Sequence, residues 1–340
     1  MKLFIIILIL ILSGCKSDFS KYPKNTTSQI PEQNLTINKN LKIDIFFSKQ
    51  SGSYYSKGVD FNITQDINDA KKSIYMGIYA LTNKKITQAL IDAKNRGVKV
   101  EVTTDDKSIS TSKFQELIDA GIKVTDDKNP KALMHEKFLI IDDNILWSGS
   151  ANYTVYAFYR NYENFVRIKS SKVSSIFTKE FNLLKNHNNQ LFIGGKYKNI
   201  EIFFSPDSRF EDILINKIKI AKKRVYFLAY TFTSKKIANA LIEANKRGVE
   251  VKGVVDEDES LNQESSKYNY LLENDINVKV DSNSYKLHSK VVIIDDDITI
   301  TGSYNFTTQA NLYNNEDSLI IKDKNITNFY TKEFNKIYFE

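Results

Sequence analysis

The sequence predicts an α/β protein made of two similar lobes, each a mixed sheet with flanking helices, related by a pseudo-twofold axis. Three observations support this prediction. The second half of the 340-residue chain repeats the first, each repeat is about 150 residues long, and strand-like and helix-like patterns alternate within it. Solenoid repeats are shorter and occur at least three times, whereas two long repeats are typical of a fused dimer.

Four pairs of segments define the repeat. "IDIFFS" at 43–48 returns at 200–205 as "IEIFFS", "NKKITQALIDAKNRGVKV" at 83–100 returns at 234–251, "DNILWSGSANYT" at 143–154 returns at 296–307, and "NYENFVRI" at 161–168 returns at 314–321. The offset changes from 157 to 151 and then stays at 153. Insertions are therefore confined to the connecting segments.

Within the first repeat, apolar or alternating segments predict strands at 41–48, 74–80, 98–104, 138–142 and 145–149. Two segments with helical spacing, 84–97 and 112–121, each end at a glycine. This alternation indicates helices packed on a sheet. We expect the first lobe to span 41–190 and the second to span 198–340.

The first fifteen residues resemble the signal of a bacterial lipoprotein. "MKLFIIILILILSGC" has one lysine, an apolar run and small residues before Cys15, and it is too short for a comfortable membrane span. The only cysteine of the chain falls where a lipobox requires it. We expect residues 1–14 to be removed and Cys15 to be lipidated. An ordinary secretory signal with a chance cysteine is the alternative.

Residues 15–40 are expected to be a flexible tether, because they are polar, contain Pro23 and Pro31 and show no apolar period. The prediction is a membrane-anchored lipoprotein of the bacterial cell envelope, exposed outside the cytoplasm. The net charge of +7 is spread along the chain. It suits an anionic lipid or nucleic-acid partner, but a solvated lysine-rich surface explains it as well.

The octapeptides "HEKFLIID" at 135–142 and "HSKVVIID" at 288–295 hold two of the three histidines. Residues two apart on a strand share a face, so each histidine should project beside the lysine that follows it. Each octapeptide is followed by Gly-Ser-x-Asn and then by Asn-x-Glu. The third histidine, His187, ends an expected helix and has no counterpart in the second repeat, which favours a surface or capping role.

These groups suit cleavage of a phosphodiester without a metal. One neutral histidine can attack phosphorus, a second can protonate the leaving oxygen, and two lysines can hold the phosphate. A glutamate can fix the tautomer of each histidine. Symmetric lobes would bring both sets to one cleft. A metal site is the alternative, but two histidines without a nearby cysteine make a poor transition-metal site, so we expect no cofactor.

The chain resembles the phospholipase D superfamily in its form with two HKD motifs in one polypeptide, and the resemblance covers roughly residues 41–340. It implies an enzyme that is functional as a monomer, with a catalytic set of His135, Lys137, Asp142, His288, Lys290 and Asp295. It also implies phosphate binding or support from Ser150, Asn152, Glu163, Ser303, Asn305 and Glu316, which follow Gly149 or Gly302.

The resemblance implies a two-step reaction. By similarity, His135 forms a phosphohistidine and His288 acts as acid and then base, although the residues themselves do not choose between them. The glutamates are the expected partners of the histidines, and the two motif aspartates could support the site from behind it.

The substrate is left open between phospholipid and nucleic acid. Compact lobes are most similar to small endonucleases and cardiolipin hydrolases, whereas a membrane tether favours phospholipid because it keeps the enzyme close to it. We expect a phospholipase D that acts on phospholipid head groups and could also transfer them to an alcohol. An envelope-anchored endonuclease is the alternative, and a non-catalytic binding lipoprotein is the third hypothesis.

One asymmetry bears on the substrate. Tyr156 and Phe158 of the first lobe replace Gln309 and Asn311 of the second. Aromatic side chains at these positions fit an apolar rim for an acyl chain, a platform for bases, or the core of the first lobe.

Overall fold

The computed structural model describes residues 35–38, 41–48, 57–110 and 113–340. The expected signal sequence, Cys15 and most of the expected tether lie outside these residues. In the part of the chain that is described, no helix has both the length and the apolar character needed to cross a bilayer.

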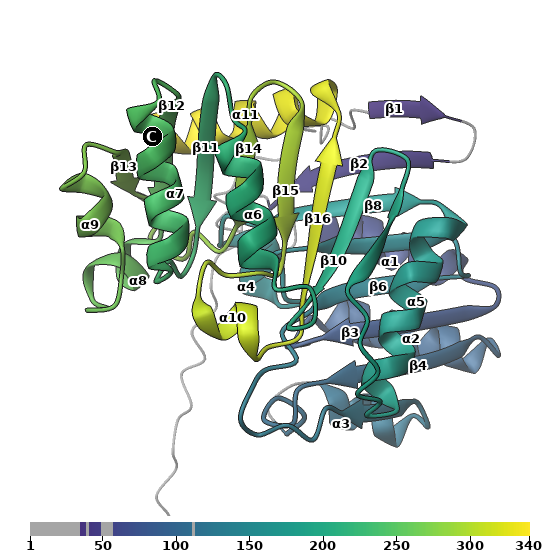
Figure 1. Ribbon diagram of the computed structural model, residues 1–340. Coiled ribbons are helices and arrows are strands. Elements are labelled where there is room, and N and C mark those ends of the chain that lie inside the picture. Colours follow the sequence, from purple (N-terminus) through teal and green to yellow (C-terminus); the bar gives the residue numbers. More distant parts are fainter. Residues whose placement is uncertain (1–34, 39–40, 49–56, 111–112) are drawn as a thin grey trace, which may run out of the picture. The chain divides into compact units, whose positions relative to one another are not determined.

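Two mixed sheets form the framework of the described residues (Figure 1). The first has the order β1-β2-β8-β7-β6-β3-β4-β5 and the second has the order β13-β12-β11-β14-β15-β16-β10-β9. The strands of the first sheet are β1 (Leu35–Asn38), β2 (Leu41–Phe47), β3 (Ser73–Ile78), β4 (Lys99–Thr104), β5 (Lys123–Asp126), β6 (Lys137–Ile141), β7 (Ile145–Gly149) and β8 (Asn164–Lys169). Those of the second are β9 (Gly194–Tyr197), β10 (Ile200–Ser205), β11 (Arg224–Ala229), β12 (Glu250–Val255), β13 (Asn277–Val280), β14 (Lys290–Ile294), β15 (Ile298–Gly302) and β16 (Glu316–Lys322).

The second sheet, taken from β9 to β13, has the same strand order as the first sheet taken from β1 to β5, as expected for two similar lobes. In each sheet three neighbouring strands are parallel, β3-β4-β5 in the first and β11-β12-β13 in the second, and the other pairs are antiparallel. The prediction of two α/β lobes with mixed sheets is therefore confirmed.

Helices cover the outer face of each sheet. The first sheet packs against α1 (Val59–Asp69), α2 (Lys84–Asn95) and α3 (Phe114–Asp119), and the second packs against α6 (Phe210–Lys219), α7 (Lys235–Lys246) and α9 (Tyr268–Leu272). Short helices α4 (Val155–Tyr159), α8 (Glu257–Leu261) and α10 (Thr308–Leu312) lie in the connections. The repeated helices α2 and α7 begin and end alike. Asn83 caps the start of α2 and Ser234 caps the start of α7, and each helix is followed by a glycine with positive φ.

A third hydrophobic cluster joins the two lobes. It contains the inner faces of both sheets together with α5 (Ser171–Lys185) and α11 (Lys324–Phe339). Phe177 and Phe181 of α5 and Tyr330 and Phe334 of α11 are almost fully buried in it. Burial of this many apolar side chains makes the boundary between the lobes a core rather than a loose domain contact.

Both lobes begin earlier than predicted. Strand β1 lies within the segment expected to be a tether, 15–40, and pairs with β2, so residues 35–38 belong to the first sheet. Strand β9 precedes the expected start of the second lobe at 198 and pairs with β10. Both are four-residue edge strands, and such short segments give too weak a pattern to be recognised in the sequence.

Candidate active site

The strand order brings the two motifs to the same end of the sheets. His135 directly precedes β6, which is antiparallel to β3 and β7, so the start of β6 lies beside the end of each. Strand β14 repeats this arrangement after His288. The lobes are hydrogen-bonded here, because the His135 amide donates to Asn315 O (2.9 Å) and the His288 amide donates to Tyr162 O (3.0 Å).

Each histidine is paired with the glutamate of the other lobe. His135 Nδ1 lies 2.8 Å from Glu316 Oε2, and His288 Nδ1 lies 3.0 Å from Glu163 Oε2. The glutamates were predicted as histidine partners, but the sequence did not indicate that the pairs cross. Neither lobe therefore holds a complete site by itself.

The motif serines hold the glutamates. Ser150 Oγ donates to Glu163 Oε2 and Ser303 Oγ donates to Glu316 Oε2, both at 2.6 Å. Both serines are fully buried. They belong to the support that the prediction allowed for, and their hydroxyl protons are directed at the glutamates rather than at a phosphate.

Burial and pairing set the charges of the histidines and glutamates. Burial lowers the pKa of His288 to about 4 and lowers that of His135, although the facing glutamate opposes it in each case. Burial raises the pKa of Glu163 and Glu316, but the paired histidine, a nearby lysine and the serine hydroxyl together outweigh it and leave each pKa below the ordinary value. Neutral imidazoles thus donate Nδ1–H to carboxylates, which leaves the Nε2 lone pair for chemistry.

The motif lysines are buried beside the histidines. Lys137 donates from Nζ to the carbonyl oxygen of His135, and Lys290 donates to that of His288 at 2.5 Å. Burial lowers the pKa of Lys137 to about 8 and that of Lys290 to about 7. Since these cations are poorly solvated, a phosphate anion that enters the site would be strongly attracted to them.

The motif aspartates do not join the site. Asp142 and Asp295 end strands β6 and β14, roughly 20 Å along the chain from the histidines. Asp142 Oδ1 accepts hydrogen bonds from the amides of Lys72 (2.7 Å) and Ser73 (3.0 Å), and Asp295 repeats this with Lys223 and Arg224. The structure therefore places these two predicted site residues away from the histidines, where they anchor a turn at the opposite end of the sheet.

The glycines and asparagines of the loops have different roles. Gly149 has φ +143°, and a Cβ there would lie 2.3 Å from Asn164 O, so the glycine allows β7 to approach β8; Gly302 is equivalent. Asn152 and Asn305 are half-buried, and among the described residues their side-chain oxygens have no hydrogen-bond partner. Their predicted role in phosphate binding or support stays a prediction.

Two tyrosines were missed by the sequence analysis. Tyr79 follows β3 with its ring centroid 5.5 Å from that of His135, and Tyr230 follows β11 with its ring 4.7 Å from that of His288. Lys290 Nζ lies 4.8 Å from the Tyr230 ring centroid. Their occurrence at the same position in both repeats was a usable signal.

Two buried aspartates fix the segment before each histidine. Asp105 Oδ2 accepts from the amide of Met134 (3.1 Å), and Asp256 Oδ2 accepts from the amide of Leu287 (2.9 Å). Asp105, Asp106 and Asp127 are also the one group of acidic side chains in the described residues close enough to share a metal. Neither catalytic histidine belongs to that group.

An acidic pair lies behind His135 and is absent behind His288. Glu136 and Glu180 are 0% and 6% exposed, and their equivalents are Ser289 and Glu333. Burial raises the pKa of Glu136 well above its usual value and that of Glu180 to about 8.

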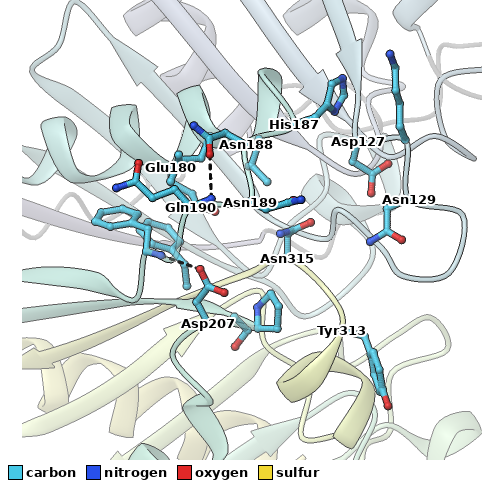
Figure 2. A pocket seen from close by; sticks show the side chains of 17 residues that line it. Asp127, Asn129, Glu180, His187, Asn188, Asn189, Gln190, Asp207, Tyr313 and Asn315 are labelled. Carbon is cyan, nitrogen blue, oxygen red and sulfur yellow. Dashed lines mark hydrogen bonds between the residues drawn. The ribbon is translucent and has the colours of Figure 1, made fainter.

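Glu180 also lines a cavity of about 550 Å³ (Figure 2). The cavity includes Asn315, the backbone partner of His135, and exposed His187, which follows α5 as predicted. None of the motif histidines or lysines lines it.

The two aromatic residues that distinguish the first lobe after its Gly-Ser loop, Tyr156 and Phe158, have different environments. Phe158 is fully buried and stacks on Phe165, so it belongs to the core of the first lobe. Tyr156 is 55% exposed. Only Tyr156 is therefore available to contact a partner.

Comparison with known proteins agrees with this geometry. A family model described as "Cardiolipin synthase, PLD-like domain" matches residues 63–185 and 214–338. A phospholipase D of Rickettsia conorii is 30% identical over 173 residues, which cover 51% of this chain and 82% of that protein. A phospholipase D of Rickettsia typhi is 33% identical over 137 residues, covering 40% and 67%. A mitochondrial cardiolipin hydrolase of Chlamydomonas reinhardtii is 32% identical over 120 residues, covering 35% and 53%.

The matches to these relatives span between 35% and 51% of this chain, which corresponds to about one lobe. A phosphatidylserine synthase of Haemophilus influenzae superposes with a TM-score of 0.66 at 13% identity, over 87% of this chain and 85% of that protein, and so shares its fold. The chain carries two phospholipase D-like domains with their motifs at one site, and it belongs to the phospholipase D superfamily of phosphodiester hydrolases.

Proposed function

We propose that this protein is a metal-independent phospholipase D that hydrolyses phospholipid head groups through a phosphohistidine intermediate. The observation that carries the proposal is the crossed pairing of two neutral histidines with two ionised glutamates beside two buried lysines. This arrangement supplies a nucleophile, an acid and a binding site for an anionic phosphate.

In the first step His135 Nε2 attacks phosphorus and the bond from phosphorus to the head-group oxygen breaks. His288 donates a proton to that oxygen. His288 takes up this proton when substrate binds, because the negative charge of the phosphodiester favours the protonated form of a nearby imidazole. Lys137 and Lys290 offset the charge on the non-bridging oxygens.

In the second step His288 accepts a proton from water, the water oxygen attacks phosphorus, and the bond from phosphorus to His135 breaks. The products are phosphatidic acid and the free enzyme. An alcohol in place of water would give transfer of the phosphatidyl group. The relatives named phospholipase D and cardiolipin hydrolase support a lipid substrate.

The full chain should be assayed in mixed micelles with EDTA present, and phosphatidic acid release should be compared among wild type, His135→Ala and His187→Ala. The proposal predicts release by wild type and His187→Ala and none by His135→Ala. His187 is the matched control because it is an exposed histidine outside the site. If wild type cleaves single-stranded DNA or RNA and releases no phosphatidic acid, the proposed lipid substrate is wrong and the endonuclease is favoured.

Membrane attachment through Cys15 is part of the same proposal. It would hold the enzyme at its substrate and raise the local lipid concentration. Metabolic labelling with a radioactive fatty acid should mark the wild-type protein in cells and leave Cys15→Ser unlabelled. Equal labelling of both proteins, or labelling of neither, would contradict the attachment.

A further inference from the structure

The His288 side of the site has an additional cation that the His135 side lacks. Lys286, His288 and Lys290 alternate along one segment, and all three side chains lie against the Tyr230 ring. In the first lobe the position equivalent to Lys286 is Leu133, which is half-buried. The second lobe thus extends its row of cations outward by one residue.

Lys286 is connected to the site through one ring. Its Nζ donates to the Tyr230 hydroxyl at 2.5 Å and lies 4.8 Å from the ring centroid. The same ring lies 4.7 Å from the His288 ring, centroid to centroid. Because Lys286 is exposed and His288 is 8% exposed, Lys286 stands where the site meets solvent.

Two exposed tyrosines and an arginine adjoin Lys286. Tyr285 is 43% exposed, the Arg160 guanidinium lies 5.1 Å from its ring centroid, and Tyr156 meets it edge-on at 5.8 Å. We call Tyr156, Arg160, Tyr285 and Lys286 the cationic rim. The equivalent positions of the other lobe hold Gln309, Tyr313, Ala132 and Leu133 and carry no charge.

We propose that the cationic rim binds the surface of an anionic phospholipid membrane and places negative lipid charge beside the scissile phosphate. This inference rests on the proposed phospholipase activity. Arginine and lysine attract anionic head groups, and tyrosine fits the interface because its ring is apolar and its hydroxyl is polar. The rim combines both properties on the one side of the site that also carries the extra lysine.

The ring geometry favours a membrane over nucleic acid. A base stacks on the open face of an aromatic ring. The Tyr285 ring is contacted on a face by Arg160, and the Tyr230 ring is contacted by Lys286 and Lys290. Cations therefore already cover part of the Tyr285 and Tyr230 rings, which leaves less ring surface on which a base could stack.

The charge of the rim can be tested with Lys286→Ala in the full chain. The ratio of turnover on phosphatidylglycerol vesicles to turnover on phosphatidylcholine vesicles should decrease about fivefold, as expected for one basic residue near an anionic surface. The matched control is Lys172→Ala, an exposed lysine at the start of α5, which should leave the ratio unchanged. An equal ratio for both variants would overturn the inference.

The tyrosines can be tested with Tyr156→Ala combined with Tyr285→Ala. The double variant should raise KM on vesicles several-fold and leave turnover of a monomeric short-chain phospholipid unchanged, because docking matters only when a membrane is present. Equal losses on both substrates would mean that the tyrosines shape the site and do not dock it. If wild type hydrolyses no phospholipid at all, the proposed function fails; hydrolysis that is insensitive to these substitutions removes only the rim. A loss confined to DNA cleavage would overturn the membrane assignment.

Discussion

The two lobes are most alike around the paired histidines, and they differ directly behind these histidines. At the site, each lobe supplies a histidine, a lysine, a serine-held glutamate and a buried aspartate anchor with nearly the same distances. Behind the histidines, the first lobe has the buried acids Glu136 and Glu180, whereas the second has Ser289 and the less buried Glu333. We infer that the crossed site requires both lobes to keep the same catalytic groups, whereas the packing behind those groups can differ between the lobes.

The largest expected effect follows from the sharing of one site. His135→Ala and His288→Ala should each lower kcat by about 10⁴-fold or more, and the double substitution should be no worse than either, because the two histidines act in one reaction. The measurement is kcat on a soluble phosphodiester. Retention of about half the activity in either single variant would show two independent sites and contradict a site shared by both lobes.

The crossed glutamates give the next effect. Glu163→Gln and Glu316→Gln should each lower kcat by about 10²- to 10⁴-fold, since each loses the charge that orients a histidine. Each glutamate raises the pKa of its partner. If His288 is the acid, Glu163→Gln moves the alkaline limb of the kcat/KM profile to lower pH, and Glu316→Gln moves the acid limb to lower pH.

NMR can verify the crossing directly. The chain has three histidines. Glu163→Gln should therefore change the ring nitrogen signals of His288 and leave those of His135 and His187 in place. A change at His135 instead would place the glutamate with the histidine of its own lobe and contradict the crossed pairs.

Asp256 and Asp295 lie at opposite ends of the second sheet, and their substitution should have smaller and different effects. Asp256→Ala removes the acceptor for the amide before His288 and should lower kcat about tenfold. Asp295→Ala removes a turn anchor at the far end and should lower the free energy of unfolding by about 1–3 kcal/mol with kcat nearly unchanged. Thermal unfolding and steady-state kinetics check both. Greater loss of kcat in Asp295→Ala would restore the motif aspartate to the catalytic set.

We expect the buried acids Glu136 and Glu180 of the first lobe to affect the stability of the protein and not its activity. The pKa of Glu180 is raised by burial from 4.5 to about 8, so the unfolded chain releases this proton first and stability decreases as pH rises between these values. Glu180→Gln removes that loss, which is about 1.4 kcal/mol per pH unit for one fully shifted group. The melting temperature of Glu180→Gln should therefore exceed that of wild type at pH 8 and match it near pH 5.

Glu333→Gln is the control for this effect, because Glu333 is the equivalent residue on α11 and is less buried. It should show a smaller gain between the same pH values. An equal gain in both variants would mean that the two lobes do not differ behind the site.

The sequence predicted the part of the site that depends on local pattern. Alternation along a strand placed His135 beside Lys137, and the repeat placed an equivalent pair in the second lobe. The placement of Asp142 was not predicted, because the eight-residue motif spans both ends of one strand and its spacing does not show which end faces substrate. The helix expected at 84–97 was predicted correctly because its apolar residues have helical spacing and a glycine marks its end.

Features that depend on packing between lobes were beyond the sequence. The pairing of Glu163 with His288 requires knowledge of how β8 meets the segment before β14, and no local spacing encodes it. The same holds for Asp105, whose carboxylate reaches an amide 29 residues away. Tyr79 and Tyr230, in contrast, stood at equivalent positions in both repeats and could have been found by comparing the repeats residue by residue.

The most direct test of the shared site is to trap the covalent intermediate. A ³²P-labelled phosphatidyl ester of p-nitrophenol, whose leaving group departs without a proton from His288, should be mixed with His288→Ala and with His135→Ala. Each reaction should be quenched and the protein examined for alkali-stable label. We expect label on His288→Ala, where His135 can still attack phosphorus but hydrolysis has lost its base, and none on His135→Ala. Label on His135→Ala alone would reverse the two roles, and absence of label from both, with a wild type that turns over, would contradict the phosphohistidine mechanism.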